Sequence, residues 1–178
     1  NDLAINPVTH LPAVIHYDKS STAAGTVAVG ALKYAYQDET GVWRIELVDA
    51  NYGTAACGTI NSYCLGAPNA AAGSTSSIMK LAFKSDGTPA IAYVFGASVA
   101  TVSGTKQIRY AERGSSGWSI ATAFSSSTAA GASNASTTAT VDPMKAVTLA
   151  FDSSNRPHVT FALYAQTLLS SEIRYLFR

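Results

Sequence analysis

The residues most often used for acid–base or metal chemistry are few in this chain and do not cluster in its sequence. There are three histidines, His10, His16 and His158, and they do not occupy matching positions in the internal repeat. His16 falls where equivalent segments carry an aromatic residue, so we expect it to fill a packing position, and we expect His10 to lie in a turn. A metal or catalytic site needs several ligands or bases that converge. No catalytic, cofactor-binding or metal-binding residue is therefore predicted.

The 11 acidic residues are spread along the chain in the same way. Asp38, Asp86 and Asp152 fall in or beside predicted tight turns, where an Asp side chain accepts hydrogen bonds from its own backbone. No paired-carboxylate pattern for glycoside hydrolysis stands out. The Gly-x-Ser-x-Gly nucleophile motif, the phosphate-binding glycine loop and the acidic calcium loop are absent from the sequence.

The two cysteines, Cys57 and Cys64, lie in a segment rich in Gly, Ala, Asn and Thr. We expect a local disulfide that closes this loop; two free thiols are the alternative. Two cysteines without a nearby histidine are too few for a closed zinc site. A disulfide would indicate an oxidising location, so the chain is predicted to be secreted, periplasmic or on the cell surface.

Composition argues for a folded domain without a general electrostatic partner. Apolar residues make up 47% of the chain and charged residues 13%, and the net charge is +1. This balance argues against disorder and gives no attraction to nucleic acid or to an anionic membrane. No apolar run approaches the roughly 18 residues needed to span a bilayer. Neither nucleic acid nor a membrane span is predicted.

An internal repeat dominates the sequence. Three segments each read as a strand, a polar turn, a proline and a second strand, and the prolines are Pro12, Pro89 and Pro157. A proline is tolerated at the first residue of a strand, and the Asp-Gly or Ser-Asn before it suits a turn. Each segment is therefore predicted to form a β-hairpin.

A third strand follows each hairpin, and in two copies a fourth follows the third. The third strands are expected at 32–36, 108–112 and 173–177, and each carries a basic residue directly before a tyrosine. The fourth strands begin with Trp43 and Trp118, and the third copy ends at Arg178 without one. Aromatic residues that recur in a repeat favour packing over a sugar-stacking platform. These repeat-defining aromatic residues are Tyr34, Tyr110, Tyr175, Trp43 and Trp118.

Four short strands in sequence order, repeated without helical periodicity, are typical of a β-propeller blade. The segments LAFKSDGTPAIAY and IRYAERGSSGWSI resemble the tandem blade repeats of bacterial exported β-propeller proteins. The resemblance implies an all-β, propeller-type fold of three four-stranded antiparallel blades, the third incomplete. The expected parts are blade 1 at about 1–49, a disulfide loop at about 50–76, blade 2 at about 77–124, a Ser/Thr/Ala-rich loop at about 125–142 and a partial blade 3 at about 143–178.

Three blades are fewer than the four to eight that close a propeller ring. The ring is therefore expected to be open, or to be completed by further chain or by further copies of this one. The leading hypothesis for function is a non-catalytic exported module for binding, adhesion or surface structure, with a protein or glycan ligand. The alternatives are part of a propeller carbohydrate-active hydrolase or lyase, and a self-assembling structural or fibre subunit.

Overall fold

The computed structural model of the chain is built from antiparallel β-strands. It describes residues 1–20, 29–49, 79–95, 107–125, 141–165 and 170–177. These ranges contain no helix, and therefore none that could cross a membrane. The strands are β1 (Asp2–Ile5), β2 (Pro12–Ser20), β3 (Val29–Gln37), β4 (Trp43–Asp49), β5 (Met79–Phe83), β6 (Pro89–Phe95), β7 (Gln107–Gly114), β8 (Gly117–Ser125), β9 (Val141–Phe151), β10 (Pro157–Ala165) and β11 (Ser170–Phe177).

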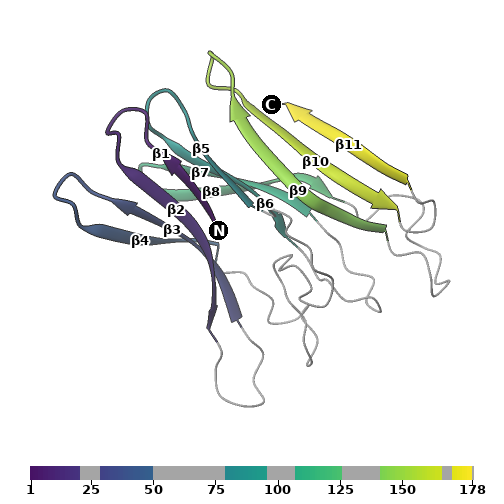
Figure 1. Ribbon diagram of the computed structural model, residues 1–178, viewed down its shortest axis with the longest axis horizontal. Helices are drawn as coiled ribbons and strands as arrows, with labels where there is room; N and C mark the ends of the chain where they lie inside the picture. The colour runs from purple at the N-terminus through teal and green to yellow at the C-terminus, as the bar shows by residue number, and fades with distance from the viewer. Residues whose placement is uncertain (21–28, 50–78, 96–106, 126–140, 166–169, 178) are drawn as a thin grey trace.

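The strands form three separate sheets in which neighbours in sequence are neighbours in space (Figure 1). The N-terminal sheet has the order β1-β2-β3-β4, the middle sheet β5-β6-β7-β8 and the C-terminal sheet β9-β10-β11. Every pairing is antiparallel. The prediction of an all-β fold made of repeated antiparallel sheets is confirmed at this level, with four, four and three strands in the described ranges.

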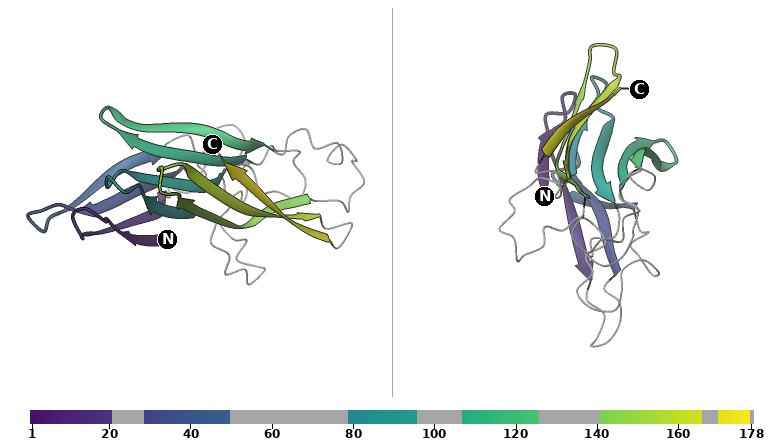
Figure 2. Two further views of the ribbon diagram at one scale, coloured as in Figure 1. Left: turned by 90° about the horizontal axis from the view of Figure 1, so that it is seen from above. Right: turned by 90° about the vertical axis from the view of Figure 1, so that its right-hand side faces the viewer.

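The three sheets lie in an open row, with the middle sheet between the other two (Figures 1 and 2). The first strand of the middle sheet, β5, contacts β1 on one side and β9 on the other. The first strands of all three sheets are thus neighbours. The N-terminal and C-terminal sheets each pack on the middle sheet, and the described residues do not close the row.

Each repeat proline begins the second strand of its sheet at an equivalent register. Pro12 lies opposite Ile5, Pro89 opposite Phe83, and Pro157 opposite Phe151. Because proline has no N–H, it is best placed where a ladder starts. The second and third hairpins have turns of the same length, whereas the first turn is one residue longer. Positions in the three sheets can therefore be compared by counting from the prolines.

The core consists of two apolar layers, one on each face of the middle sheet. In β6 the residues Ile91 and Tyr93 pack toward the N-terminal sheet, whereas Ala90 and Ala92 pack toward the C-terminal sheet. Side chains alternate between the two faces of a strand, so a strand covered on both faces must be apolar at nearly every position. This explains the uninterrupted apolar sequence of β6, in which every residue but the last is buried.

Three hairpin turns share one backbone geometry. In the turns that begin at Asp38, Lys84 and Asp152, the first N–H donates to the fifth carbonyl and the fourth N–H donates back to the first carbonyl. The fourth residue has positive φ: +82° for Gly41, +83° for Gly87 and +58° for Asn155. This is the three-residue hairpin loop that ends in a left-handed residue, a position that Gly and Asn tolerate.

The described strands extend slightly beyond the expected ones. β9 begins at Val141, inside the range 125–142 that was expected to be a loop, and is the longest strand, with 11 residues. Its partner β10 pairs with it as far as Ala165. The extension depends on cross-strand pairing, which the Ser/Thr/Ala composition of the preceding segment does not indicate.

Candidate functional site

One candidate site is a cleft of about 230 Å³ between the N-terminal and middle sheets, at the end where their hairpin turns lie. The cleft is lined by residues of the β1–β2 turn, the end of β3 with the β3–β4 turn, and the β5–β6 turn. Both aromatic and hydrogen-bonding side chains line it. Among them are Asn6, Tyr34, Tyr36, Gln37, Glu39 and Arg113.

The aromatic part of the cleft is built from two stacked tyrosines of β3. The rings of Tyr34 and Tyr36 lie 5.4 Å apart with an interplanar angle of 23°. Trp118 of the middle sheet packs edge-on against Tyr34 at 5.3 Å. Burial raises the pKa of the Tyr34 hydroxyl well above its usual value. The contact between Tyr34 and Trp118 joins the two sheets.

One wall of the cleft is a charged cluster that bridges the sheets. Arg113 of β7 donates two hydrogen bonds to the carboxylate of Glu46 on β4, at 2.9 and 2.7 Å. The indole N–H of Trp118 donates to the same carboxylate at 3.1 Å. The guanidinium of Arg113 also lies over the ring of Tyr36 at 5.5 Å. The hydrogen bonds that Arg113 donates to Glu46 raise the pKa of Arg113, so the guanidinium stays charged and forms an ion pair with this carboxylate.

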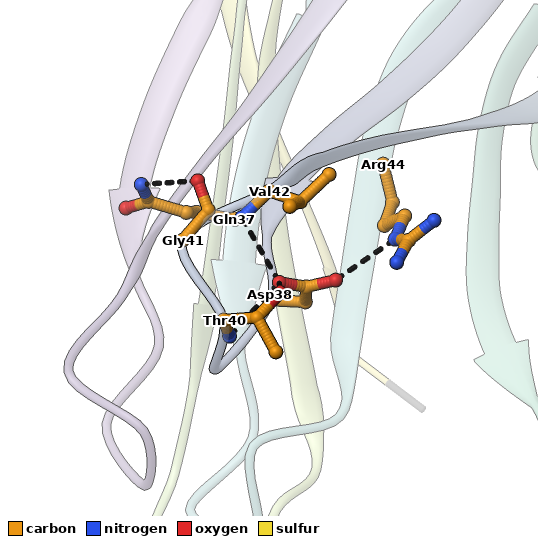
Figure 3. Close-up of polar contacts among 6 residues, drawn as sticks. All are labelled: Gln37, Asp38, Thr40, Gly41, Val42 and Arg44. Atoms are coloured by element: carbon orange, nitrogen blue, oxygen red, sulfur yellow. Dashed lines mark hydrogen bonds and ion pairs between the residues drawn. The ribbon is translucent and has the colours of Figure 1, made fainter.

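The opposite rim of the cleft is the β3–β4 turn, which a single carboxylate organises (Figure 3). Asp38 Oδ1 accepts hydrogen bonds from the hydroxyl of Thr40 at 2.6 Å and from the backbone N–H groups of Thr40 and Val42 at 3.0 Å. Its Oδ2 accepts from Arg44 at 2.8 Å. The Thr40 hydroxyl and Arg44 lower the pKa of Asp38 to about 2. Glu39, by contrast, is exposed at the rim.

Asp152 plays the same part in the β9–β10 turn. Its Oδ1 accepts from the N–H groups of Ser154 and Arg156, and its Oδ2 accepts from the Arg156 side chain at 2.7 Å. The backbone of Arg156 is the first cause of its lowered pKa. The interpretation of Asp38, Asp86 and Asp152 as turn-stabilising residues agrees with these bonds, since Asp86 accepts from the N–H of Thr88 at 2.9 Å.

Polar contacts also join the turns of neighbouring sheets. The Asn6 side chain donates to the carbonyl of Gly87 at 3.2 Å. At the next boundary, the Asn155 side chain accepts from the N–H of Ser85 at 2.8 Å and donates to its hydroxyl at 2.9 Å. Of the turns that frame the cleft, β1–β2 and β5–β6 are therefore held together by the hydrogen bond from Asn6 to Gly87.

A buried ion pair lies at the other end of the same sheet boundary. Asp49, at the end of β4, is buried and accepts hydrogen bonds from the Tyr93 hydroxyl at 2.6 Å and from Arg109 at 2.9 Å. Arg109 also lies 3.2 Å above the ring centre of Phe95. Burial, and then the bond to Asp49, raise the pKa of Tyr93. Because every charged group here has a partner, the cluster is a structural joint.

At the next boundary the equivalent positions are apolar. Phe124 and Phe161 replace Asp49 and Tyr93, and their rings lie 4.9 Å apart. The sequence did not single out Asp49 or Arg113 as joining residues. The one sequence feature that could have pointed to Asp49 is its place directly after the apolar residue Val48, at the end of a predicted strand.

The histidines occupy three different settings. His10 has φ of +59° in the β1–β2 turn, and His16 is half-buried on the outer face of the N-terminal sheet. His158 contacts the Tyr175 hydroxyl through Nδ1 and lies 3.4 Å from Asp152 through Nε2. The structure does not bring these histidines together. Within the described residues, no three His, Cys, Asp or Glu side chains gather where they could hold a metal ion.

The repeat-defining aromatic residues divide between interfaces and open faces. Tyr34 and Tyr110 are buried between sheets, and Trp118 packs against that boundary. Trp43 and Tyr175 are exposed on faces that no described sheet covers. The predicted pair Cys57 and Cys64, with the expected loop 50–76, lies outside the described residues, so the disulfide stays a prediction.

Comparisons with family models, with curated proteins and with solved structures found no match to this chain. The fold and the cleft described above are therefore the basis for any statement about function.

Proposed function

We propose that this chain is a non-catalytic exported binding module of the β-propeller type, and that the cleft between its N-terminal and middle sheets binds a polar ligand, a protein segment or a glycan. The cleft carries the proposal because it combines tyrosine rings with a fixed cation, an amide and an exposed carboxylate. Such sites bind through a few well-placed polar groups on a largely preformed surface.

The charges around the cleft favour a ligand that offers both donors and acceptors. Arg113 supplies a guanidinium group that its two hydrogen bonds to Glu46 hold in place. Glu39 supplies an exposed carboxylate on the other rim. The carboxylates of the described turns have lowered pKa values and are engaged by their own backbone. They are therefore suited to holding turns, whereas a general acid needs a raised pKa.

The experiment is a binding screen of the chain against glycans and surface proteins, followed by nuclear magnetic resonance (NMR) mapping of any ligand. We expect chemical-shift changes at Tyr36, Gln37 and Glu39, and an affinity about tenfold lower for Glu39→Ala, because a hydrogen bond to a charged group contributes about 1.5 kcal/mol. Ser153→Ala, at an exposed residue of the β9–β10 turn that does not line the cleft, is the control. A hydrolase activity found together with no ligand in the screen would overturn the proposal.

A second candidate is a self-assembling subunit, and one observation favours it. The outer face of the N-terminal sheet exposes Leu3, Ile5, Ile45 and Leu47. Contiguous exposed apolar side chains often mark an interaction surface. Sedimentation velocity over a range of concentrations tests it: the double variant Ile45→Thr with Leu47→Thr should lower the average mass. A chain that is monomeric at all concentrations contradicts assembly.

A further inference from the structure

A second groove, of about 250 Å³, lies between the middle sheet and the C-terminal sheet and is independent of the cleft proposed as the ligand site. It lies beside β11, whose residue Leu176 lines it. Among the described strands, β11 pairs only with β10 and is therefore an edge strand. The side chains that line it are mainly apolar. They include Tyr110, Ala121, Ala123, Pro157, Val159 and Leu176.

The equivalent place at the other sheet boundary is filled by a fourth strand. Tyr110 lies opposite Ala121 in the middle sheet, as Tyr34 lies opposite Glu46 in the N-terminal sheet. Over Tyr34 lies Trp118, the second residue of β8, with its ring 5.3 Å away. The groove over Tyr110 is therefore the position that an aromatic residue of a fourth strand would occupy in the C-terminal sheet.

The edge of β11 completes the template. An edge strand presents unpaired N–H and C=O groups that an added strand can bond, with pockets for alternate side chains giving specificity. In the middle sheet Ala111 of the third strand lies opposite Ile120 of the fourth. By the repeat, Leu176 occupies the position of Ala111, so an added antiparallel strand would place its isoleucine opposite Leu176.

We propose that the β11 edge and this groove bind an extended strand of the β8 type, whose leading aromatic side chain fills the groove over Tyr110. One difference between the two boundaries indicates which contacts the aromatic side chain of the bound strand makes. Glu46, which accepts the indole N–H of Trp118, is replaced by Ala121. The groove therefore takes its aromatic residue by apolar contact alone.

The test uses a fluorescent peptide with the sequence of residues 116–125, titrated with the folded chain and followed by fluorescence anisotropy. We expect saturable binding, with NMR amide shifts along β11 and at Ala121 and Ala123. The peptide carrying Trp118→Ala should bind at least tenfold more weakly, since a buried aromatic pair and its apolar area are lost. Equal binding of a scrambled peptide, or no binding by a chain that NMR shows to be folded, would overturn the proposal.

A gain-of-function variant provides the matched control. Ala121→Glu restores the carboxylate found at position 46, so it should tighten binding of the tryptophan peptide about tenfold. It should leave unchanged the binding of a peptide with Trp118→Phe, which has no indole N–H. Circular dichroism verifies that the variant is folded. If the β11 amides are protected from hydrogen exchange without peptide and the chain is dimeric, a second copy occupies the edge and the proposal is wrong.

Discussion

At the scale of single residues, equivalent positions at the two sheet boundaries carry polar side chains at one boundary and aromatic side chains at the other. Asp49 with Tyr93 joins the N-terminal and middle sheets, and Phe124 with Phe161 joins the middle and C-terminal sheets. A buried ion pair seldom contributes more net stability than an apolar pair of similar size, but removing one partner leaves an uncompensated charge. Because Asp49 is the ion-pair partner of Arg109 as well as the acceptor for Tyr93, two phenylalanines at these positions would leave Arg109 without its carboxylate.

Replacing Asp49 by alanine should lower the free energy of unfolding by about 2 kcal/mol, because Arg109 and Tyr93 lose their buried acceptor while Arg109 keeps some access to water. Chemical denaturation measures the change. The double variant Asp49→Phe with Tyr93→Phe copies the other boundary, and Arg109 keeps its stacking on Phe95. It should be more stable than Asp49→Ala, and equal stability of the two would contradict the equivalence.

The pKa of Asp38 provides a second test at this scale. Its folded value of about 2 lies below the unfolded value of about 3.9, so the stabilisation it reports is present above pH about 4 and is lost as the pH falls through about 2. Thr40→Ala removes the main hydrogen bond and should raise the pKa of Asp38 toward its ordinary value. Carbon NMR of the carboxyl groups measures it.

The control is Ser154→Ala in the β9–β10 turn, where Ser154 bonds Asp152 through its backbone N–H. This change should leave the pKa of Asp152 low. If the pKa of Asp38 does not move in Thr40→Ala, the hydroxyl is not what holds this carboxylate in its charged form.

At the scale of elements, the hairpin turns have two structural roles. They reverse the chain with one left-handed residue, and they contact the turn of the next sheet. Gly41 serves only to reverse the chain, because a Cβ atom added there would approach only the Gln37 amide, at 3.7 Å. Gly87 both reverses the chain and contacts the neighbouring turn, because an added Cβ would lie 3.0 Å from the Asn6 side chain and 3.2 Å from Val8.

We therefore expect Gly41→Ala to lower the free energy of unfolding by about 1 kcal/mol, the cost of positive φ for a residue with a Cβ atom. Gly87→Ala should cost at least about 1 kcal/mol more, since the Asn6 contact must also shift. Thermal and chemical unfolding of the two variants side by side measures the difference. Equal losses would show that the turn-to-turn contact adds nothing to stability.

At the scale of the whole molecule, stability comes from two layers between three sheets, while the outer faces remain open. Ile15 and Ile45 belong to the same sheet and carry the same side chain, yet Ile15 is 0% exposed and Ile45 is 64% exposed. Ile15 faces the middle sheet in the apolar cluster. Because the sheets pack face to face, the two isoleucines are expected to contribute very differently to the free energy of unfolding.

Ile15→Ala should lower the free energy of unfolding by about 3 kcal/mol, through lost transfer energy and the cavity left behind. Ile45→Ala should change it by less than about 0.5 kcal/mol, as exposed positions usually do. Urea unfolding at a concentration where the chain is monomeric measures both. A large loss for Ile45→Ala under those conditions would mean that another part of the chain covers this outer face.

The sequence by itself determined the strands, the hairpins and their register. Alternation of apolar residues has the period of a strand, proline marks a ladder's first residue, and Asp, Gly and Asn encode the turns locally. These are short-range effects, so they can be predicted from neighbours in the chain. The extension of β9 back to Val141 and the αL conformation of His10 were less visible, because pairing and turn length override composition there.

Only the tertiary structure decided which faces of the sheets meet and what lies between them. Glu46 meets Arg113 and Trp118 across a boundary from positions far apart in sequence. Asp49 becomes a buried joint rather than a surface acid. The cleft, the groove beside β11 and the open outer face follow from how whole sheets stack, which is a long-range property that no local pattern encodes. The candidate sites could therefore be located only after the three sheets were assembled.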